Sequence, residues 1–360
     1  MAYTNIDDPS AHFQALTYTG NGSNPRNLTN DGNSDLKPDL IWGKSRGTNI
    51  DHQLYDSSRG FGTSKGLQSN STATESGQTT YGYISASLTD GFTAAAGGTN
   101  GDWFNRNNDP FVAWQWKANG GTTSSNTDGN ITSTVQVNQD AGFSIVTYTG
   151  NGSNNQTIGH GLGVQPSWWV VKRRDSANDW FVGASSVLGG TSNYVRLNSG
   201  SANAESNNIW GDSPTSSTLF RVSNHAGLNA SGGTYVAYLF ANKQGFSKFG
   251  SYVGNGNSNG TFVYTGFKPA FVITKVTDDA RDWRMWDAAR DTFNVVEKYL
   301  TPNTTGAEGT TSTLNIDFLS NGFKLRGNHV STNQSGKTFI YMAFAENPFV
   351  TSGGIPTTAR

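Results

Sequence analysis

The residues with the types and spacing for chemistry are few in this chain of 360 amino acids. Five histidines stand singly, at positions 12, 52, 160, 225 and 329, and none forms an HExxH or HxxxH metal-binding pattern. No cysteine is present, which excludes disulfides, thiolate metal sites and a cysteine nucleophile. The stretches TNDGNSD (29–35) and NTDGN (126–130) resemble fragments of calcium loops but lack the full ligand spacing, so they predict Asx turns. We therefore expect no metal site and no cofactor.

An Asp-x-x-Arg pair recurs at aligned positions of the third block, as Asp56 with Arg59 and as Asp287 with Arg290. The corresponding middle stretch is interpreted as having Gly183 and Ser186 at these positions. A carboxylate and a guanidinium at this spacing can brace a tight turn, so the pairs are predicted to be structural. Hydrolysis of glycosides needs two carboxylates, and no second recurring one is identified. The chain is therefore predicted to have no catalytic residues and not to be an enzyme.

Aromatic residues in polar stretches are the better candidates for binding. Trp103 and Phe104 lie in GDWFNRNND (101–109), and Trp210 lies in NNIWGDSP (207–214). An exposed tryptophan in such company can stack on a sugar while neighbouring polar side chains bond its hydroxyl groups. The alternative is that each ring folds back onto its own domain or packs at an interface, because tryptophan is costly to leave in water. These three residues are the candidate ligand or interface contacts.

The sequence blocks that are expected to position these residues occur in three copies. YTGNG (18–22 and 148–152) and YVGNG (252–256) are each followed by a proline-led apolar run: LKPDLIWGKSR (36–46), VQPSWWVVKRR (164–174) and FKPAFVITKVT (267–277). Three further blocks follow in the same order in each copy. The sequence thus predicts three homologous modules: residues 1–121; residues 122–245, beginning with a linker strand; and residues 246–360.

The blocks are short, rich in Val, Ile, Phe, Tyr and Trp, and bounded by Gly, Asn and Pro, which is typical of an all-β protein. We predict three tandem β-sandwiches of concanavalin or jelly-roll type. The closing stretches FVAWQWKA (111–118) and TFIYMAFA (338–345) are apolar on both faces, which predicts strands packed on both sides. Residues 282–300 favour a helix by propensity, but the repeat predicts a strand followed by a turn. The Gly-Asn-Gly turns are predicted to be structural reversals with positive φ.

The composition limits the classes of partner that this protein is expected to bind. The net charge is −1 and only 14% of residues are charged, so a nucleic-acid partner is not expected. No apolar run reaches the length of a membrane-spanning helix, and the first residues lack the features of a secretory signal. A protein of this kind found outside cells would be expected to leave by lysis.

With these blocks aligned, DLIWGKSR (39–46), HQLYDSSRG (52–60) and FVAWQWKANGG (111–121) resemble a module of unknown function in virion structural proteins of tailed, mostly marine, bacteriophages. The resemblance implies a virion protein that is assembled in the bacterial cytoplasm and released by lysis. It implies other virion proteins as partners and offers no catalytic residue.

The function expected from this resemblance is a non-enzymatic tail fibre or adhesin that presents sandwich loops to a host cell-surface glycan. With no heptad or collagen-like tract, a homo-oligomer, favoured as a trimer, would have to form through the sandwiches themselves. A capsid decoration protein or head fibre is the alternative, and a polysaccharide-degrading enzyme is the second alternative.

Overall fold

The protein is all-β in the computed structural model, which describes residues 2–75, 80–97, 103–184, 188, 192–206, 208–212 and 215–357. All paired strands of its sheets run antiparallel. Helix in the described part is confined to four short segments: η1 (Pro9–Ala11), α1 (Ala226–Asn229), η2 (Ser312–Leu314) and α2 (Val330–Asn333). The predicted fold class is thus confirmed as all-β. Residues 282–300 hold a strand followed by a turn, as the repeat predicted, and no helix.

Three large sheets share one strand order. The first contains β1 (Phe13–Thr19), β7 (Pro110–Trp116), β3 (Leu40–Ser45) and β4 (Gln53–Asp56), in that spatial order. The second repeats it with β10 (Phe143–Thr149), β17 (Thr234–Phe240), β12 (Trp168–Arg173) and β13 (Trp180–Gly183). It continues through β9 (Ser133–Asn138) and β8 (Ser124–Asn126) on one side, and β14 (Asn193–Arg196) and β15 (Ala204–Glu205) on the other. The third has β18 (Ser247–Val253), β26 (Thr338–Pro348), β20 (Phe267–Val276) and β21 (Arg284–Asp287).

A smaller sheet accompanies each large one. These are β2 (Arg26–Leu28), β6 (Phe92–Ala95) and β5 (Tyr83–Ser87); β11 (Gln156–Gly159) and β16 (Leu219–Val222); and β19 (Phe262–Tyr264), β25 (Gly322–Leu325) and β24 (Ile316–Leu319). A separate pair joins β22 (Lys298–Tyr299) to β23 (Gly309–Thr310). Apolar residues of each small sheet, such as Phe92, Phe220 and Phe323, pack in one core with the large sheet beside it. Each lobe therefore buries apolar surface between its two sheets.

The register of the large sheets is also shared. Across the central pair of strands, Leu40 lies opposite Trp116, Trp168 opposite Phe240, and Phe271 opposite Phe344. A proline stands two residues before each of Leu40, Trp168 and Phe271, at Pro38, Pro166 and Pro269. The three prolines therefore occupy the same place in the three sheets, as expected from the repeat.

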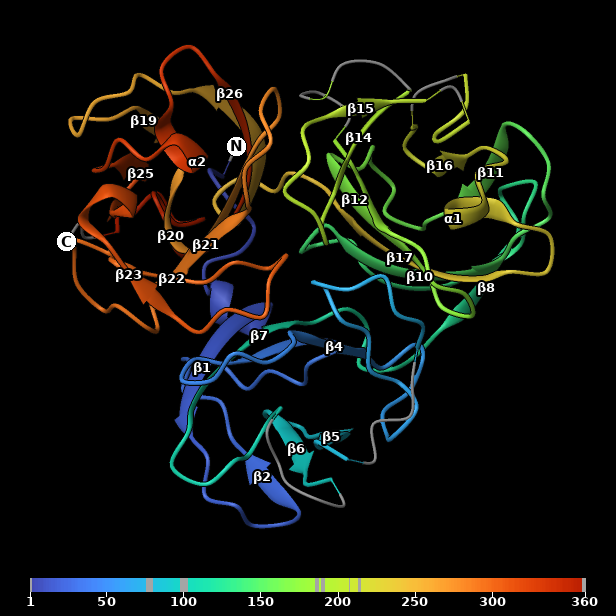
Figure 1. Ribbon diagram of the computed structural model, residues 1–360, viewed down its shortest axis with the longest axis horizontal. Helices are drawn as coiled ribbons and strands as arrows, with labels where there is room; N and C mark the ends of the chain where they lie inside the picture. Colours follow the sequence, from blue (N-terminus) through green and yellow to red (C-terminus); the bar gives the residue numbers. More distant parts are fainter. Residues whose placement is uncertain are drawn as a thin grey trace.

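The second face of each large sheet turns toward the other two. Rings of Trp116, Phe240 and Phe344 contact one another, with centroids 6.4, 5.6 and 5.8 Å apart. They belong to one continuous buried cluster to which all three large sheets contribute. Figure 1 shows the resulting arrangement of three lobes around a common centre. This explains why the closing strands β7, β17 and β26 are apolar on both faces, because one face packs on the small sheet and the other on the shared centre.

An asparagine from a distant segment holds each Gly-Asn-Gly turn, and in the second and third lobes it is the last residue of α1 and α2. Its side-chain oxygen accepts a hydrogen bond from the amide of the central turn residue, at 3.0, 2.8 and 2.9 Å for the pairs Asn21–Asn105, Asn151–Asn229 and Asn255–Asn333. The motif tyrosine donates to the carbonyl oxygen just before the asparagine, in the pairs Tyr18–Phe104, Tyr148–Leu228 and Tyr252–Thr332. The repeated motif is therefore an anchoring device between two distant parts of each lobe.

Steric constraints explain why glycine occupies both positions of the motif. A Cβ atom on the first would lie 1.9 to 2.4 Å from a backbone carbonyl oxygen, at Gly20, Gly150 and Gly254. The second has a positive φ of 70°, 77° and 68°, at Gly22, Gly152 and Gly256. Any side chain at the first position would collide, and any L-residue at the second would be strained. The predicted structural role of the turn is confirmed.

Candidate functional site

The three aromatic candidates are buried rather than displayed. Trp103, Phe104 and Trp210 expose only 4%, 0% and 4% of their surface. Trp103 packs against Tyr81 with ring centroids 5.3 Å apart, and Trp210 packs edge-on to Trp169 at 5.4 Å. The structure agrees with the alternative reading, in which these rings fold back onto their own lobes, and none of the three is exposed to stack on a sugar. Most sequence neighbours are polar in both cases, but the packing partners Tyr81 and Trp169 come from elsewhere in the chain.

The indole N–H of Trp210 has a partner inside the fold as well. It donates a 2.9 Å hydrogen bond to the carbonyl oxygen of Asn193. A buried tryptophan whose N–H is satisfied internally has nothing left to offer a ligand. These residues are therefore packing residues of their lobes.

The two Asp-x-x-Arg pairs brace their turns as predicted. In each pair the aspartate accepts from both the guanidinium and the backbone amide of the arginine; for Asp287 and Arg290 these bonds are 2.6 and 2.8 Å long. Asp56 and Arg59 make the same two contacts. All four side chains are fully buried. A buried pair of this kind is stable only when its remaining lone pairs and N–H groups also have hydrogen-bond partners.

Those partners come from adjacent lobes, which the sequence did not indicate. The hydroxyl of Tyr238 donates to Asp56 over 2.7 Å, and the indole N–H of Trp114 donates to Asp287 over 2.9 Å. Tyr238 and Trp114 occupy the same register position, each two residues before the ring that faces the centre. The turn pairs are therefore part of the junctions between lobes.

A second carboxylate extends each network. Glu75 lies between Arg59 and Arg174 of the next lobe, 2.8 Å from each. Glu308 lies between Arg290 and Arg46 in the same way, at 3.2 and 2.8 Å. In both cases the backbone amide of the glutamate also bonds the carbonyl oxygen of the arginine across the junction. Two of the three junctions therefore have the same arrangement of two carboxylates and two arginines.

The third junction is uncharged at each matching position described. Gly183 pairs with Trp169, so the position of the aspartate in the middle lobe belongs to Ala184, and the sequence interpretation was one residue off. Its partner Ser186 lies outside the described residues, as does the residue at the arginine position. Asn203 takes the place of the glutamate and bonds the carbonyl oxygen of Thr277, which stands where the other lobes have arginine. Met342 replaces the donor ring, so acceptor and donor are absent together.

A recurring carboxylate was missed in the sequence. Asp51, Asp179 and Asp282 open the third block in all three copies. Each accepts from an asparagine side chain over 2.7 or 2.8 Å, in the pairs Asn70–Asp51, Asn198–Asp179 and Asn303–Asp282. The same asparagine accepts from the amide of the residue after the aspartate. The signal was an aspartate directly before His or Trp in every copy, and its role is to hold a loop.

Three equivalent lysines lie inside the lobes. The next-to-last residues of the proline-led strands are Lys44, Lys172 and Lys275. They are fully buried and donate to backbone carbonyl oxygens rather than to carboxylates. Burial lowers the pKa of each to about 8. These ammonium groups satisfy carbonyl oxygens at the strand ends and have no access to a substrate.

Two motifs with a catalytic or metal-binding appearance are ordinary turns. Residues 256–260 spell GxSxG, which the sequence interpretation passed over; they form exposed turns in which Asn257 accepts from the amide of Asn259 at 2.8 Å. Asn126 likewise accepts from the amide of Asp128, so NTDGN makes an Asx turn. Among the described residues, no three His, Cys, Asp or Glu side chains lie together as metal ligands would. His225 and His329 cap α1 and α2 through their Nδ1 atoms.

The chain belongs to a domain family of unknown function, DUF7483, whose family model matches residues 8–348. This single model spans all three large sheets. No curated protein and no solved structure matches the chain significantly. In the described part of the chain, no helix is long and apolar enough to cross a membrane.

Proposed function

We propose that the chain consists of three tandem homologous β-sandwich modules, residues 1–121, 122–245 and 246–360, each of concanavalin or jelly-roll type. The shared strand order, the equivalent prolines and the three asparagine anchors support this division. The face of each large sheet that turns toward the shared centre is apolar and packs against the other two lobes. The modules therefore depend on one another for solubility and form one structural unit.

We further propose that the protein is a non-enzymatic structural component of a bacteriophage virion. The observation that carries this is the aromatic centre, where Trp116, Phe240 and Phe344 join three lobes into one body. The recurring aspartates are engaged in structural contacts with Asn70, Asn198 and Asn303, and Asp56 and Asp287 are paired with buried arginines. The sequence resemblance described above supplies the virion context, with other virion proteins as partners.

Within the virion, a tail fibre or adhesin that contacts a host glycan is the first candidate. The burial of Trp103, Phe104 and Trp210 removes the contacts proposed for that role and favours the alternative, a capsid decoration protein or head fibre. The trimer expected from the sequence would have buried sandwich faces between copies. One chain already supplies three lobes around an axis, so burying these faces requires no second copy.

The experiment that tests the proposal is localisation in intact particles. Cryo-electron microscopy of the phage, with antibody fragments against this chain, would show density at the capsid for a decoration protein and at the tail for a fibre. Absence of the chain from purified particles would refute the virion assignment. Release of reducing ends from host capsule or lipopolysaccharide, abolished by one Asp or Glu substitution, would contradict the non-enzymatic assignment.

A further inference from the structure

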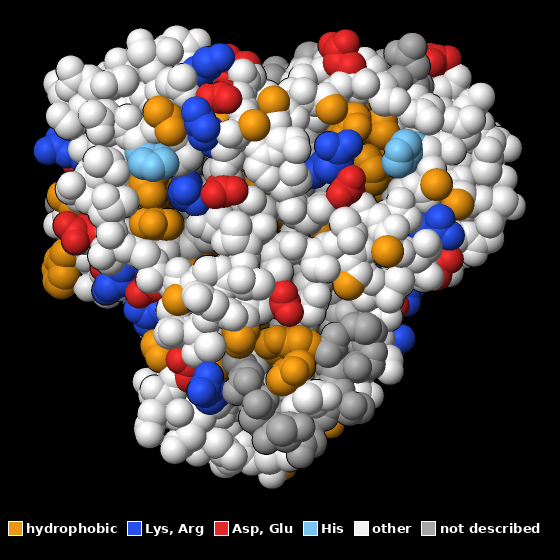
Figure 2. All heavy atoms as spheres, viewed as in Figure 1, with side chains coloured by type: hydrophobic (Ala, Val, Ile, Leu, Met, Phe, Trp, Pro, Cys, Tyr) orange, Lys and Arg blue, Asp and Glu red, His pale blue; other side chains and the backbone are white. Residues whose placement is uncertain are grey.

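An open cleft of about 450 Å³ lies beside α2, where the second and third lobes meet. Its walls include Gly200 from the second lobe and Arg281, Asp282, Arg284, His329 and Ser331 from the third. The volume is within the range of sites for small ligands. Figure 2 shows a histidine beside basic side chains on the lobe that carries α2. This cleft involves none of the buried networks at the lobe junctions.

The two arginines, Arg281 and Arg284, have no arginine counterpart in the other two lobes. Arg284 pairs with Thr274 at the position that Phe181 holds in the second lobe and Gln53 in the first. Counting back from the shared aspartate, Arg281 stands where the other lobes have Asn178 and Ile50. Asp282 and His329, by contrast, have counterparts in Asp179 and His225. The other lobes form the same sheets with no guanidinium group at either position.

The donors on the cleft are only partly engaged. The Nδ1 atom of His329 accepts from the amide of Ser331 at 3.1 Å, so in the neutral ring the proton is on Nε2. Arg281 is 3.2 Å from Asp279, in a half-exposed pair. Arg284 donates to the hydroxyl of Thr301 at 2.7 Å and lies over the ring of Tyr299, and its 3.7 Å distance to Asp282 is beyond hydrogen-bond range. Asp282 is itself held by Asn303 at 2.8 Å. The cleft therefore offers the guanidinium group of Arg281, part of the guanidinium group of Arg284, an imidazole N–H and one carboxylate.

The charges of the cleft act on one another. Burial lowers the pKa of His329, and the positive charges of Arg284 and Arg281 lower it further. His225, in the matching place, lies instead edge-on to Phe181 with ring centroids 4.9 Å apart. An anion between the guanidinium groups would favour the charged imidazolium of His329 and leave His225 unaffected.

We propose that this cleft binds an anionic sugar, with Arg281 and Arg284 contacting its carboxylate or sulfate group and Asp282 accepting bonds from its hydroxyls. Guanidinium groups match the geometry of such anions and bind them in bidentate fashion. A carboxylate beside them suits a ligand that carries hydroxyl groups as well as a charge. The proposal stands independently of the virion assignment, because it concerns the purified protein alone.

The test follows the imidazole of His329 by NMR through a pH titration, with His225 as an internal reference. D-glucuronate is expected to raise the pKa of His329 by roughly half a unit or more while that of His225 stays constant. Glucose, which lacks the charge, is expected to give no shift. Inorganic sulfate separates recognition of a bare anion from recognition of an anionic sugar.

The control variants copy the other lobes. Arg281→Asn and Arg284→Gln carry the residues of the second and first lobes, and each is expected to abolish the glucuronate effect. Arg281 is half exposed, so Arg281→Asn keeps the fold intact. No shift with glucuronate, or a shift that survives both substitutions, would overturn the proposal. A sulfate effect as large as the glucuronate effect would overturn the sugar part of it.

Discussion

The hydroxyl of Tyr238 donates a 2.7 Å hydrogen bond to the carboxylate of Asp56, a residue 182 positions away and in another lobe. Asp56 is fully buried and is also paired with Arg59. Tyr238→Phe removes the donor and leaves a buried acceptor without its third partner, so we expect a loss of about 1–3 kcal/mol in the free energy of unfolding. Urea denaturation measures it. As a control, Tyr264→Phe, at an exposed hydroxyl, is expected to change stability by less than about 0.5 kcal/mol; equal effects would contradict the junction role.

The uncharged junction suggests how the charged ones can be replaced. Asp287→Ala alone leaves the buried Arg290 with Glu308 as its remaining charge partner and is expected to cost about 3–5 kcal/mol. The combination Asp287→Ala, Arg290→Val, Glu308→Asn, Arg46→Thr and Trp114→Met copies the residues of the middle lobe and its neighbour. We expect this combination to be more stable than Asp287→Ala, because no buried charge remains unpaired. Thermal denaturation compares them, and a combined loss larger than the single loss would refute the idea that the five positions act as a unit.

The anchoring asparagines are expected to be essential to their lobes. Asn229 is fully buried, accepts from the amide of Asn151 and donates to the carbonyl oxygen of Ser153 at 2.8 Å. Asn229→Ala removes these bonds and leaves the turn unsatisfied, at a cost of about 2–4 kcal/mol. Hydrogen exchange should show increased exchange of the Asn151 amide. Asn154→Ala, in the exposed part of the same turn, serves as the control; unchanged protection in Asn229→Ala would contradict the anchoring role.

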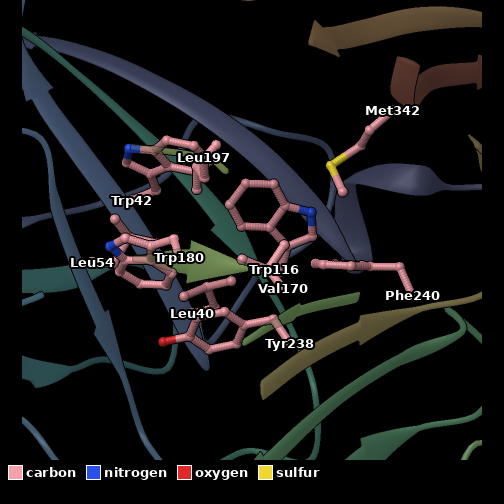
Figure 3. Close-up of a pocket in the computed structure, with 10 residues that line it drawn as sticks. All are labelled: Leu40, Trp42, Leu54, Trp116, Val170, Trp180, Leu197, Tyr238, Phe240 and Met342. Atoms are coloured by element: carbon pink, nitrogen blue, oxygen red, sulfur yellow. The ribbon is translucent and has the colours of Figure 1, made fainter. Parts of the chain in front are cut away.

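The shared centre contains a small cavity of about 40 Å³ lined only by hydrophobic side chains and Tyr238 (Figure 3). Val170 is among its lining residues, and Val170→Ile would add one methyl group in this space. Filling it is expected to stabilise the protein by up to about 1 kcal/mol, at roughly 24 cal/mol per Å³. Val171→Ile, one residue on and packed in the second lobe's own core, should instead be neutral or destabilising. A destabilised Val170→Ile variant would contradict the cavity.

Stability should depend on pH through the buried lysines. The pKa of Lys44, Lys172 and Lys275 falls from 10.5 to about 8 on burial, so between these values the unfolded chain binds more protons than the folded one. The free energy of unfolding is therefore expected to rise from pH 8 toward pH 10, by at most about 1.4 kcal/mol per pH unit for each lysine. Above pH 10 the buried Tyr18, Tyr148 and Tyr252, whose pKa is raised by burial, reverse the trend.

Denaturation curves between pH 7 and 10 measure this dependence. Lys172→Met removes one titrating group and should flatten the rise by about a third. A profile that is flat or falling between pH 8 and 10 in the parent protein would show that these ammonium groups are not desolvated as the structure places them.

The sequence by itself determined the elements and their repetition. Glycine and asparagine specify turns locally, since their backbone preferences act within a few residues, and Pro38, Pro166 and Pro269 marked equivalent places in the three sheets. The apolar character of β7 and β26 on both faces also indicated packing on both sides. These features depend on local chemistry and on the two-residue period of a strand, both of which can be read along the chain.

Only the tertiary structure decided which residues are available for function. Trp103 and Trp210 stand among mostly polar neighbours in the sequence, yet both are buried, with Tyr81 and Trp169 from elsewhere in the chain packed against them. Asp56 accepts a hydrogen bond from Tyr238, and Glu75 forms an ion pair with Arg174. Both contacts cross junctions between lobes and could not be predicted from a local sequence pattern. Burial is a property of surfaces brought together by folding, so a residue's exposure and charge partners follow from the arrangement of the three lobes rather than from its place in the sequence.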